Sequence, residues 1–312
     1  MGKAKVYIDG QSGTTGLQIF DRISAREDLE LLRIDEDKRH DTEERRRFLN
    51  AADIVFLCLP DEGAREAVAL VDNPDVRIID ASTAHRTADG WTYGFPELNA
   101  GQRAAIAGSH RIANPGCHAT GLISVTAPLV QAGLLPADYP LTCFSLTGYS
   151  GGGKRMIADY EADGRPVALD APGIYGLSLE HKHLPEMQKV CGLVHEPVFL
   201  PVVDDYYKGM ATSIMLHNAL LVGAPSTAEV HACLTEHYAG QQLVSVAPLG
   251  SNGPVLYANE LAGTNKLRIV VCGNDERTTV TALFDNLGKG ASGAAVQSMN
   301  IVLGIDETTG LL

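Results

Sequence analysis

The chain has 312 residues, of which 45% are hydrophobic and 20% are charged, and its formal net charge is −13. This composition is that of a globular protein, and the length favours two domains over a single hydrophobic core. The negative charge disfavours nucleic acid or an anionic membrane as a partner, and no apolar run is long enough to span a bilayer. Six scattered cysteines, without a Cys-x-x-Cys pair or a secretory signal pattern, predict a cytoplasmic protein rather than a disulfide scaffold.

The first predicted strand leads into a glycine-rich loop. Residues 5–9 (KVYID) are predicted to form a buried strand, residues 10–16 are Gly-Gln-Ser-Gly-Thr-Thr-Gly, and apolar residues at helical spacing follow from Leu17. A glycine loop that enters a helix N-terminus is the arrangement that binds the pyrophosphate of a dinucleotide. The spacing Gly-x-x-Gly-x-x-Gly differs from the usual Gly-x-Gly-x-x-Gly, so a tight turn without a ligand is the alternative.

The second predicted strand, residues 29–34, ends in Asp35-Glu36-Asp37-Lys38-Arg39. An acidic residue at this position usually accepts the ribose 2′-hydroxyl of NAD, whereas an arginine accommodates the 2′-phosphate of NADP. Both residue types are present, so this segment does not decide between the two cofactors. The charge run Glu43-Glu44-Arg45-Arg46-Arg47 is interpreted as a solvated helix face.

Further strands are predicted at residues 53–59, 76–80 and 111–113, with helical segments between them. This alternation indicates a doubly wound parallel sheet, in which Cys58 is predicted to be core. Ligands bind at the carboxyl ends of such strands. We therefore expect a nucleotide on the glycine loop and the groups that follow residue 113 to share one cleft.

The segment after residue 113 is Asn114-Pro115-Gly116-Cys117. Asn-Pro-Gly is a turn sequence, and the apolar spacing from Leu122 onward predicts a helix that begins at or near Cys117. Backbone N–H groups and the helix dipole at that position favour the thiolate, which is the nucleophilic form. A small buried hydrophobe is the alternative interpretation of Cys117.

Residues 148–155 (GYSGGGKR) form a second polar segment that is predicted to be a loop. Its backbone N–H groups, the Ser150 hydroxyl and the cations Lys154 and Arg155 suit a phosphate or a carboxylate. A flexible linker is the alternative.

A third polar segment is His181-Lys182-His183-Leu184-Pro185-Glu186. If His183 opens a helix, Glu186 is close enough to orient an imidazole and raise its basicity. Either histidine is then a candidate acid/base partner of Cys117. Metal ligation and purely structural histidines are the alternatives.

The second half has more strands than helices. Strands are predicted at residues 141–147, 194–203, 209–217, 242–246, 267–272 and 277–284, and a helix at 227–238. Without strict alternation, this pattern predicts an α+β domain with a mixed or antiparallel sheet, in which Cys143 and Cys272 are core. A Gly/Ala-rich helix at 288–303 is expected to return to the N-terminal sheet or to a neighbouring subunit. The predicted fold class is α/β, with a Rossmann-type parallel sheet domain plus an α+β substrate or dimerisation domain.

In their order along the chain, these motifs resemble those of the N-acetyl-γ-glutamyl-phosphate reductases, and the length resembles the shorter type of that family. The matching segments are 10–16, Asp80-Ala81-Ser82 through Arg86, Tyr93-Gly94-Phe95-Pro96-Glu97-Leu98, Asn114-Pro115-Gly116-Cys117, Ser150 to Lys154, and His181 to Glu186. The resemblance covers essentially the whole chain. It implies the fold of aspartate-semialdehyde and glyceraldehyde-3-phosphate dehydrogenases, NADP as the cofactor, and a homodimer or homotetramer. The acidic run Asp35-Glu36-Asp37 is the one departure from the expected 2′-phosphate site.

The same resemblance implies a role for each matching residue. The implied domains are an NADP-binding domain at 1–116, with helix 286–312 returning to it, and a catalytic domain at 117–285. Catalytic roles fall on Cys117, His181, His183 and Glu186. Cofactor binding falls on Gly10, Ser12, Gly13, Thr14, Thr15, Gly16, Arg33 and Ser82. Substrate binding falls on Arg86, Asn114, Ser150, Gly151, Lys154 and Arg155, and no metal is implied.

The implied reaction is the NADPH-dependent reduction of the small acyl phosphate N-acetyl-L-glutamyl 5-phosphate, in arginine biosynthesis, through a thioester on Cys117. A reductase that acts on aspartyl phosphate is a second hypothesis, which the paired histidines and the Gly151-Gly152-Gly153-Lys154 loop disfavour. A cofactor-independent Cys/His hydrolase or transferase is a third hypothesis, and a nucleotide-binding sensor without catalysis is a fourth.

Overall fold

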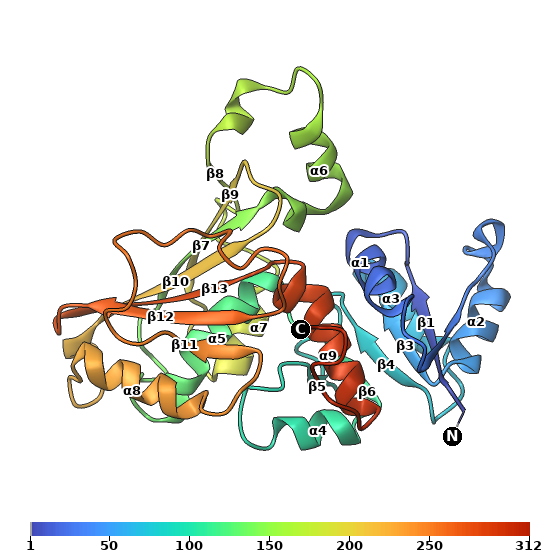
Figure 1. Ribbon diagram of the computed structural model, residues 1–312, viewed down its shortest axis with the longest axis horizontal. Coiled ribbons are helices and arrows are strands. Elements are labelled where there is room, and N and C mark those ends of the chain that lie inside the picture. Colours follow the sequence, from blue (N-terminus) through green and yellow to red (C-terminus); the bar gives the residue numbers. More distant parts are fainter. Residues whose placement is uncertain (1) are drawn as a thin grey trace. The chain divides into compact units, whose positions relative to one another are not determined.

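The computed structural model describes residues 2–312, which form two compact units. Unit 1 contains the chain up to residue 96 together with residues 101–115 and 291–312. Unit 2 contains residues 97–100 and 116–290. Figure 1 labels most of the helices and strands of both units.

Unit 1 is built on a parallel sheet with the strand order β2-β1-β3-β4-β6-β5. The parallel sheet predicted from the sequence is therefore confirmed. All four residues of β3 are buried, which accounts for its continuous apolar sequence. The strands are β1 (Ala4–Asp9), β2 (Leu29–Leu32), β3 (Ile54–Leu57), β4 (Arg77–Asp80), β5 (Thr92–Tyr93) and β6 (Arg111–Ala113).

The C-terminal helix of the chain belongs to unit 1. Helix α9 (Gly293–Val302) packs against α1, α4 and β4, and Arg26 Nη1 donates to Asn300 Oδ1 at 2.6 Å. In the described structure this helix lies in the same compact unit as the N-terminal sheet. The other helices of unit 1 are α1 (Thr14–Ile23), the 3₁₀ turn η1 (Glu36–Lys38), α2 (Thr42–Ala51), α3 (Asp61–Ala69) and α4 (Gln102–Gly108).

Unit 2 is built on a mixed sheet with the order β11-β12-β13-β10-β7-β9-β8. The β11–β12 and β7–β9 pairs are parallel and the other pairs are antiparallel, so the predicted mixed sheet is confirmed. The strands are β7 (Thr142–Gly148), β8 (Gly173–Ile174), β9 (Val198–Asp204), β10 (Met210–His217), β11 (Val244–Val246), β12 (Leu267–Gly273) and β13 (Arg277–Phe284).

Helix α5 (Cys117–Gln131) is the central helix of unit 2. It is buried along most of its length and packs against β10, β13, α7 and α8. Its first residue is Cys117, as predicted. The other helices are η2 (Tyr149–Gly152), α6 (Gly153–Glu161), η3 (Val167–Asp170), α7 (Leu184–Cys191), η4 (Asn218–Leu220) and α8 (Thr227–His237), and a π-helical turn, η5 (Gly288–Ser292), leads the chain back to unit 1.

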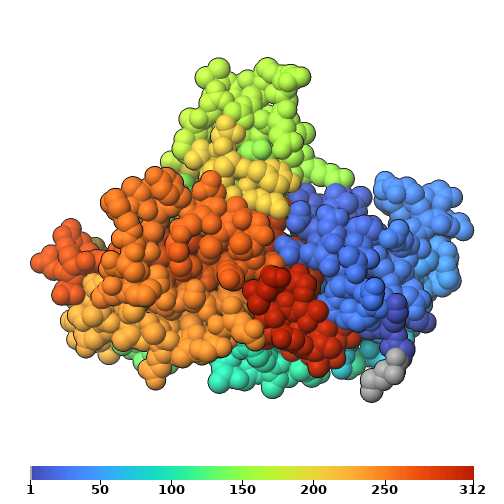
Figure 2. All heavy atoms as spheres, in the orientation of Figure 1, coloured from blue at the N-terminus to red at the C-terminus, as the bar shows by residue number. Residues whose placement is uncertain are grey.

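The prediction of a loop at residues 148–155 was wrong. This stretch forms η2 and the first turn of α6, with Gly153 at φ +74°, a conformation that favours glycine where the two helices join. Lys154 and Arg155 are consequently exposed helical residues. The part of the chain that starts with α6 projects from the rest of unit 2. It is yellow-green in Figure 2.

Of the three cysteines predicted to be core, Cys272 and Cys58 are not buried. Cys143 is buried in β7, as predicted, but Cys272 is exposed. The last two residues of β12, Cys272 and Gly273, extend beyond the covered part of the sheet. Cys58 follows the last residue of β3 and is partly buried rather than core. Within residues 2–312, no helix is long and apolar enough to cross a membrane.

Candidate active site

The glycine loop lies at the carboxyl end of β1, where the strand order changes direction between β1 and β3. Gly10 has φ +85°, and a side chain on it would overlap the carbonyl of Cys58. A Cβ on Gly16 would lie only 2.5 Å from the Gly10 carbonyl oxygen, and the Gly13 N–H donates to that same oxygen at 3.0 Å. Among residues 2–312 no side chain caps α1, so its first N–H groups, from Thr14 to Gly16, remain to bind an anion.

A cavity of about 490 Å³ adjoins this loop. Gly10, Gln11 and Ser12 line one part of it, and Glu36, Arg39 and His40 line another. Arg39 donates to Glu36 and, at 3.2 Å, to His40 Nε2. Arg33, a predicted cofactor residue, is not among the lining residues of this cavity, because its guanidinium lies 5.0 Å from the centroid of the Phe20 ring.

The residues that line this cavity include a buried ion pair that was not predicted from the sequence. Arg45 Nη2 donates to Asp9 Oδ2 at 2.9 Å, and the two residues are 8% and 5% exposed. Burial raises the pKa of the Asp9 carboxyl, and the hydrogen bond from Arg45 opposes that shift. Arg45 was predicted to lie on a solvated face, but α2 packs against β1 and turns this one residue of the charge run inward.

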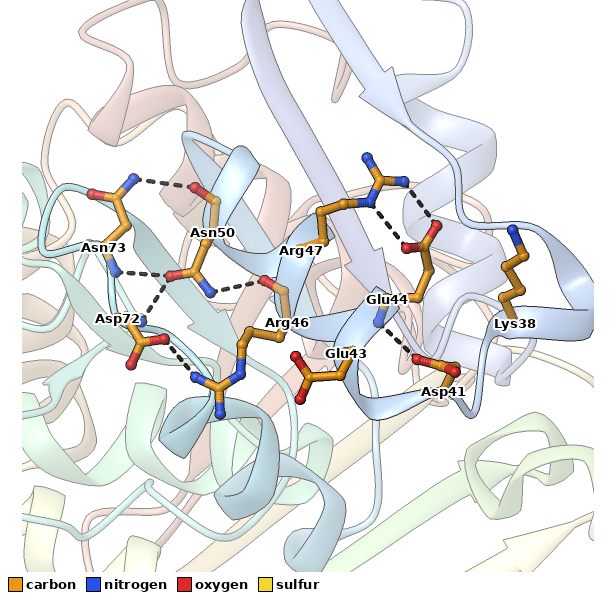
Figure 3. A pocket seen from close by; sticks show the side chains of 9 residues that line it. All are labelled: Lys38, Asp41, Glu43, Glu44, Arg46, Arg47, Asn50, Asp72 and Asn73. Carbon is orange, nitrogen blue, oxygen red and sulfur yellow. Dashed lines mark hydrogen bonds and ion pairs between the residues drawn. The ribbon is translucent and has the colours of Figure 1, made fainter.

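The rest of that charge run lines a shallow pocket on the outer side of α2 (Figure 3). Arg46 pairs with Asp72 at 2.5 Å, and Arg47 pairs with Glu44 at 2.8 Å. Asn50 accepts the backbone N–H groups of Asp72 and Asn73 (Figure 3). These side chains form ion pairs and hydrogen bonds with one another at the surface. This part of α2 is therefore the solvated helix face that was predicted.

Ser82, another predicted cofactor residue, is engaged within the turn after β4. Its hydroxyl donates to Asp80 Oδ2 at 2.7 Å and accepts the Ala84 N–H at 3.1 Å. The same fully buried carboxylate pairs with His85 Nδ1 at 2.6 Å, and the His85 ring stacks on Trp91 with 4.1 Å between centroids. Ser82 therefore shapes this turn with its side chain, and its contact with a cofactor stays a prediction.

Arg86 and Asn114 support the turn that precedes the nucleophile. Arg86 donates from Nε to the Asn114 carbonyl and from Nη2 to the Ala81 carbonyl, both at 3.0 Å. Asn114 is 1% exposed and its Nδ2 donates to the Ala291 carbonyl at 3.0 Å. Its Oδ1 is buried and has no hydrogen-bond partner within residues 2–312, which leaves an acceptor for a ligand.

Cys117 occupies the first turn of α5 and is partly buried. Gly116 is the N-cap residue, and its N–H donates to Glu186 Oε1 at 2.8 Å. Glu186 thus holds the turn that presents the thiol. A Cβ added to Gly290 would lie 3.1 Å from Cys117 Cβ, so the glycine of η5 leaves room for this residue.

The predicted histidines come together with a third one. The rings of His181 and His183 are 4.7 Å apart, and His118 lies 5.5 Å from His181 and 5.9 Å from His183. His183 is the N-cap of α7 and is 4% exposed, whereas His181 is only partly buried. The His183 N–H donates to His181 Nδ1 at 3.2 Å, so the neutral His181 ring carries its hydrogen on Nε2.

The sequence analysis missed His118. Its position directly after Cys117 was the one available signal, but its burial to 3% exposure depends on packing against β7, β9 and the residues after β8. Burial, and secondarily electrostatic interactions with His181 and Lys182, lower the pKa of His118 to about 3. His118 is therefore neutral at ordinary pH.

The ion pair between Lys289 and Glu97 is fully buried and was also not predicted from the sequence. Lys289 Nζ lies 2.8 Å from both carboxylate oxygens of Glu97, and the exposure of both side chains is 0%. Lys289 precedes Gly290, where an added Cβ would lie 3.1 Å from Cys117 Cβ. The pair therefore anchors η5 beside the nucleophile.

Ser150 is hydrogen-bonded to Asn286, which lies two residues before η5 in the chain. Asn286 Nδ2 donates to its hydroxyl at 3.0 Å, while Asn286 Oδ1 accepts the Gly209 N–H at 2.9 Å. Lys154 and Arg155 follow at the N-terminal end of α6, where helix N–H groups add to their positive charge. Within residues 2–312, no group of three or more His, Cys, Asp and Glu side chains is arranged to hold a metal ion.

Comparison with known proteins agrees with this architecture. The family model "Semialdehyde dehydrogenase, NAD binding domain" matches residues 27–106, and "Semialdehyde dehydrogenase, dimerisation domain" matches residues 117–286. The crystal structure of aspartate semialdehyde dehydrogenase II from Vibrio cholerae, complexed with ASA, aligns over 97% of this chain and 99% of its own, with a TM-score of 0.71 at 15% identity. The Candida albicans enzyme with NADP aligns with a TM-score of 0.68 at 17% identity, over 97% and 99% of the two chains. The fold and the matched domains define a semialdehyde dehydrogenase.

Closer relatives carry a more specific name. N-acetyl-gamma-glutamyl-phosphate reductase 2 of Nostoc sp. is 47% identical over the full length of both chains. The protein of the same name from Pseudomonas putida is 50% identical over 98% of both chains, and the reductase of Brucella ovis is 49% identical over 97% of this chain and 99% of its own. The chain belongs to the N-acetyl-γ-glutamyl-phosphate reductase family.

Proposed function

We propose that this protein converts N-acetyl-L-glutamyl 5-phosphate, NADPH and a proton into N-acetyl-L-glutamate 5-semialdehyde, phosphate and NADP⁺. The observation that carries the proposal is Cys117 at the first turn of α5, on a turn that Glu186 holds, in a chain 46–50% identical to reductases of that name. Arginine biosynthesis is the corresponding pathway. Unit 1 binds the nucleotide and unit 2 carries the nucleophile.

The residues of unit 1 fit a dinucleotide phosphate. The glycine loop and the N–H groups of Thr14, Thr15 and Gly16 suit the pyrophosphate. Arg39 lines the neighbouring cavity and is proposed to pair with a 2′-phosphate, while Glu36 neutralises part of the Arg39 charge and the His40 ring lies beside it. When bound there, NADPH supplies the hydride of the reaction.

The first half of the reaction uses Cys117 as the nucleophile. Its thiolate, favoured by the N–H groups at the start of α5, attacks the acyl carbon, and the bond to the phosphate oxygen breaks to leave a thioester. Lys154 and Arg155, together with the N-terminus of α6, offset the negative charge of the departing phosphate. The phosphate takes up the proton that the overall reaction consumes.

The second half regenerates the thiolate. Hydride addition to the thioester carbon gives a thiohemiacetal oxyanion, which collapses to the aldehyde as the carbon–sulfur bond breaks. We assign oxyanion stabilisation to the backbone N–H groups near Cys117 and to Nε2–H of His181, the less buried of the two predicted histidines. His183 caps α7, and Asn114 Oδ1 offers an acceptor to the substrate.

The reaction is tested in reverse, because an acyl phosphate is labile. NADP⁺ reduction is followed by absorbance with N-acetylglutamate semialdehyde and phosphate, beside aspartate semialdehyde and beside NAD⁺. Phosphate-dependent turnover of the acetylated substrate alone is the expected result. Turnover of aspartate semialdehyde alone would move the substrate to that of the fold neighbours, and no turnover with either would contradict the proposal.

We further propose a cytoplasmic homodimer or homotetramer. The match of residues 117–286 to a dimerisation domain supports self-association. Light scattering coupled to size-exclusion chromatography is expected to give a mass of two or four chains of 33.2 kDa. A single chain over the working concentration range would contradict this assembly.

A further inference from the structure

A chain of hydrogen-bonded side chains runs through unit 2 from the residue next to the nucleophile. His118 Nδ1 lies 2.8 Å from Ser145 Oγ, and Ser145 Oγ lies 2.7 Å from Thr212 Oγ1. On the other side of the ring, His118 Nε2 lies 2.6 Å from the Tyr175 hydroxyl. These four residues come from α5, β7, β10 and the segment after β8. Both ring nitrogens of His118 are therefore engaged, and neither belongs to the mechanism given above.

The direction of this chain can reverse because His118 is neutral. A neutral imidazole donates from one nitrogen and accepts at the other. In one direction the Tyr175 hydroxyl donates to Nε2 and Nδ1 donates to Ser145. In the other direction Nε2–H donates to the Tyr175 oxygen, and the hydrogen of Tyr175 is released for another acceptor. Ser145 and Thr212 are both fully buried hydroxyls that can donate or accept in either direction.

Tyr175 is a partly buried residue whose apolar neighbours in the chain are exposed. Ile174, Leu177 and Leu179 are 53%, 77% and 48% exposed, whereas the Tyr175 ring contacts His118 and His181. Its backbone N–H donates to the Pro201 carbonyl at 3.1 Å, and its hydroxyl bonds His118. Burial, and secondarily the negative charge of Cys117, raise the pKa of the Tyr175 phenol, so this group stays protonated and able to donate beside the thiolate.

We propose that His118 is a positioning residue that holds the Tyr175 hydroxyl beside Cys117 and, with its Nε2–H donating to the phenol oxygen, directs the phenol hydrogen to the reacting sulfur or oxyanion. This inference rests on the proposed thioester chemistry, but not on which semialdehyde is the substrate. Ser145 and Thr212 support the required tautomer from the opposite side. The groups that face His118 are Tyr175, His181, Lys182 and His183, and Cys117 is its neighbour in the helix.

The test compares Tyr175→Phe, His118→Asn and the double variant. Asparagine keeps a partner for Ser145 at the Nδ1 position but cannot reach Tyr175, whereas His118→Gln places an N–H near the Nε2 position. We expect a 10- to 100-fold lower kcat, an order-of-magnitude range for one lost donor, with little change in KM, in each single variant. The double variant is expected to be no slower than Tyr175→Phe, and His118→Gln is expected to regain part of the rate.

A second readout does not depend on turnover. The rate of Cys117 alkylation by iodoacetamide, followed by peptide mass spectrometry as a function of pH, reports the thiolate. If Tyr175 donates to the sulfur, the pH midpoint of Cys117 alkylation rises in Tyr175→Phe, because the thiolate has lost a donor. The rise should be the same in His118→Asn and in the double variant. His231→Asn is the matched control, since this partly buried histidine lies in helix α8, where its Nε2 is 2.8 Å from the Ala247 carbonyl oxygen.

Two results would overturn the proposal. One is an unchanged kcat and alkylation midpoint in Tyr175→Phe. The other is a His118→Asn effect that multiplies fully with that of Tyr175→Phe, which would show that the two residues act independently. NADPH titration and thermal unfolding of each variant establish that it is folded, and a failure of the wild-type enzyme on the acetylated substrate would instead contradict the proposed function.

Discussion

At the scale of single residues, the chemistry depends on a thiol whose surroundings are built by distant parts of the chain. Cys117 begins α5, while Glu186, 70 residues from Gly116, holds the turn before it. Gly290 leaves space beside it. The Cys117 thiol is therefore positioned by the first turn of α5, by the Glu186 carboxylate of α7 and by Gly290 of η5.

Replacing Cys117 by serine is expected to abolish turnover, because a hydroxyl at this position is far less nucleophilic than a thiolate. NADPH binding, measured by fluorescence titration, should be unchanged because the glycine loop is untouched. Cys272→Ser is the matched control, since Cys272 is exposed and lies in β12, and its activity should equal that of the wild type. Full activity of Cys117→Ser would contradict the thioester mechanism.

The buried His118 predicts a pH dependence of stability. Its pKa is about 3 in the folded chain and about 6.5 in the unfolded chain. Above pH 6.5 the group is neutral in both states and contributes no slope. As the pH falls from about 6.5 toward 3, the unfolded chain binds a proton that the folded chain does not, so the free energy of unfolding decreases by about 1.4 kcal/mol per pH unit from this group.

Urea unfolding of the wild type and of His118→Asn between pH 6 and pH 4 measures this contribution. The slope of the wild type is expected to exceed that of the variant by about 1.4 kcal/mol per pH unit, because one titrating group has been removed. Equal slopes in the two proteins would mean that the folded state also protonates His118. His231→Asn again serves as the comparison for loss of a histidine that is not fully buried.

The Lys289–Glu97 pair makes a separate prediction. Lys289→Met leaves the Glu97 carboxylate buried without its cation, and breaking a buried pair in this way typically costs about 3–5 kcal/mol. The free energy of unfolding in urea should fall by that amount. Lys266→Met, at an exposed position, should change it by less than about 0.5 kcal/mol. A decrease in the free energy of unfolding of less than about 1 kcal/mol in Lys289→Met would contradict the conclusion that this pair is fully buried.

At the scale of elements, local patterns predicted most helices and strands because their causes are local. The strand at residues 111–113, the helix from Cys117 and the helix from Thr227 begin where they were predicted to begin. Residues 148–155 were mistaken for a loop because their three successive glycines disfavour helix. The backbone N–H groups of Tyr149 and Ser150 donate to the carbonyls of Tyr206 and Tyr207, which hold this stretch in its helical turns.

The glycine loop and α1 form an element whose geometry can be tested. Gly16→Ala would place a Cβ 2.5 Å from the Gly10 carbonyl oxygen and force the loop open. We expect NADPH affinity to fall at least about tenfold, which corresponds to about 1.4 kcal/mol. Gly108→Ala at the end of α4 is the control, since nothing lies within 4 Å of its Cβ. Wild-type affinity in Gly16→Ala would contradict the tight packing of the loop.

At the scale of the whole molecule, the chain crosses between its two units more than once, and its last residues complete the first unit. Helix α9 packs against α1, α4 and β4, and Arg103 pairs with Glu307 at 2.7 Å. Unit 1 therefore cannot be completed until the end of the chain is present. This connection explains why the predicted helix at 288–303 belongs with strands that precede it by more than 170 residues.

Ending the chain after residue 290 is expected to abolish NADPH binding, because β4, α1 and α4 lose the helix that covers them. Fluorescence titration measures the binding, and circular dichroism during heating should show an early transition in the truncated chain. Removing only Leu312, which is 73% exposed, should leave both measurements unchanged. A truncated chain with wild-type affinity would contradict the role of α9.

The sequence by itself determined the parallel sheet, the mixed sheet, the glycine loop and a helix that begins at Cys117, since each depends on residues close together in the chain. Only the tertiary structure decided which side chains meet. Arg45 turns inward to Asp9, Lys289 reaches Glu97 across 192 positions, and His118 joins Ser145 to Tyr175. The physical reason is burial: charged and polar groups removed from water must find partners, and folding alone brings those partners within hydrogen-bond distance.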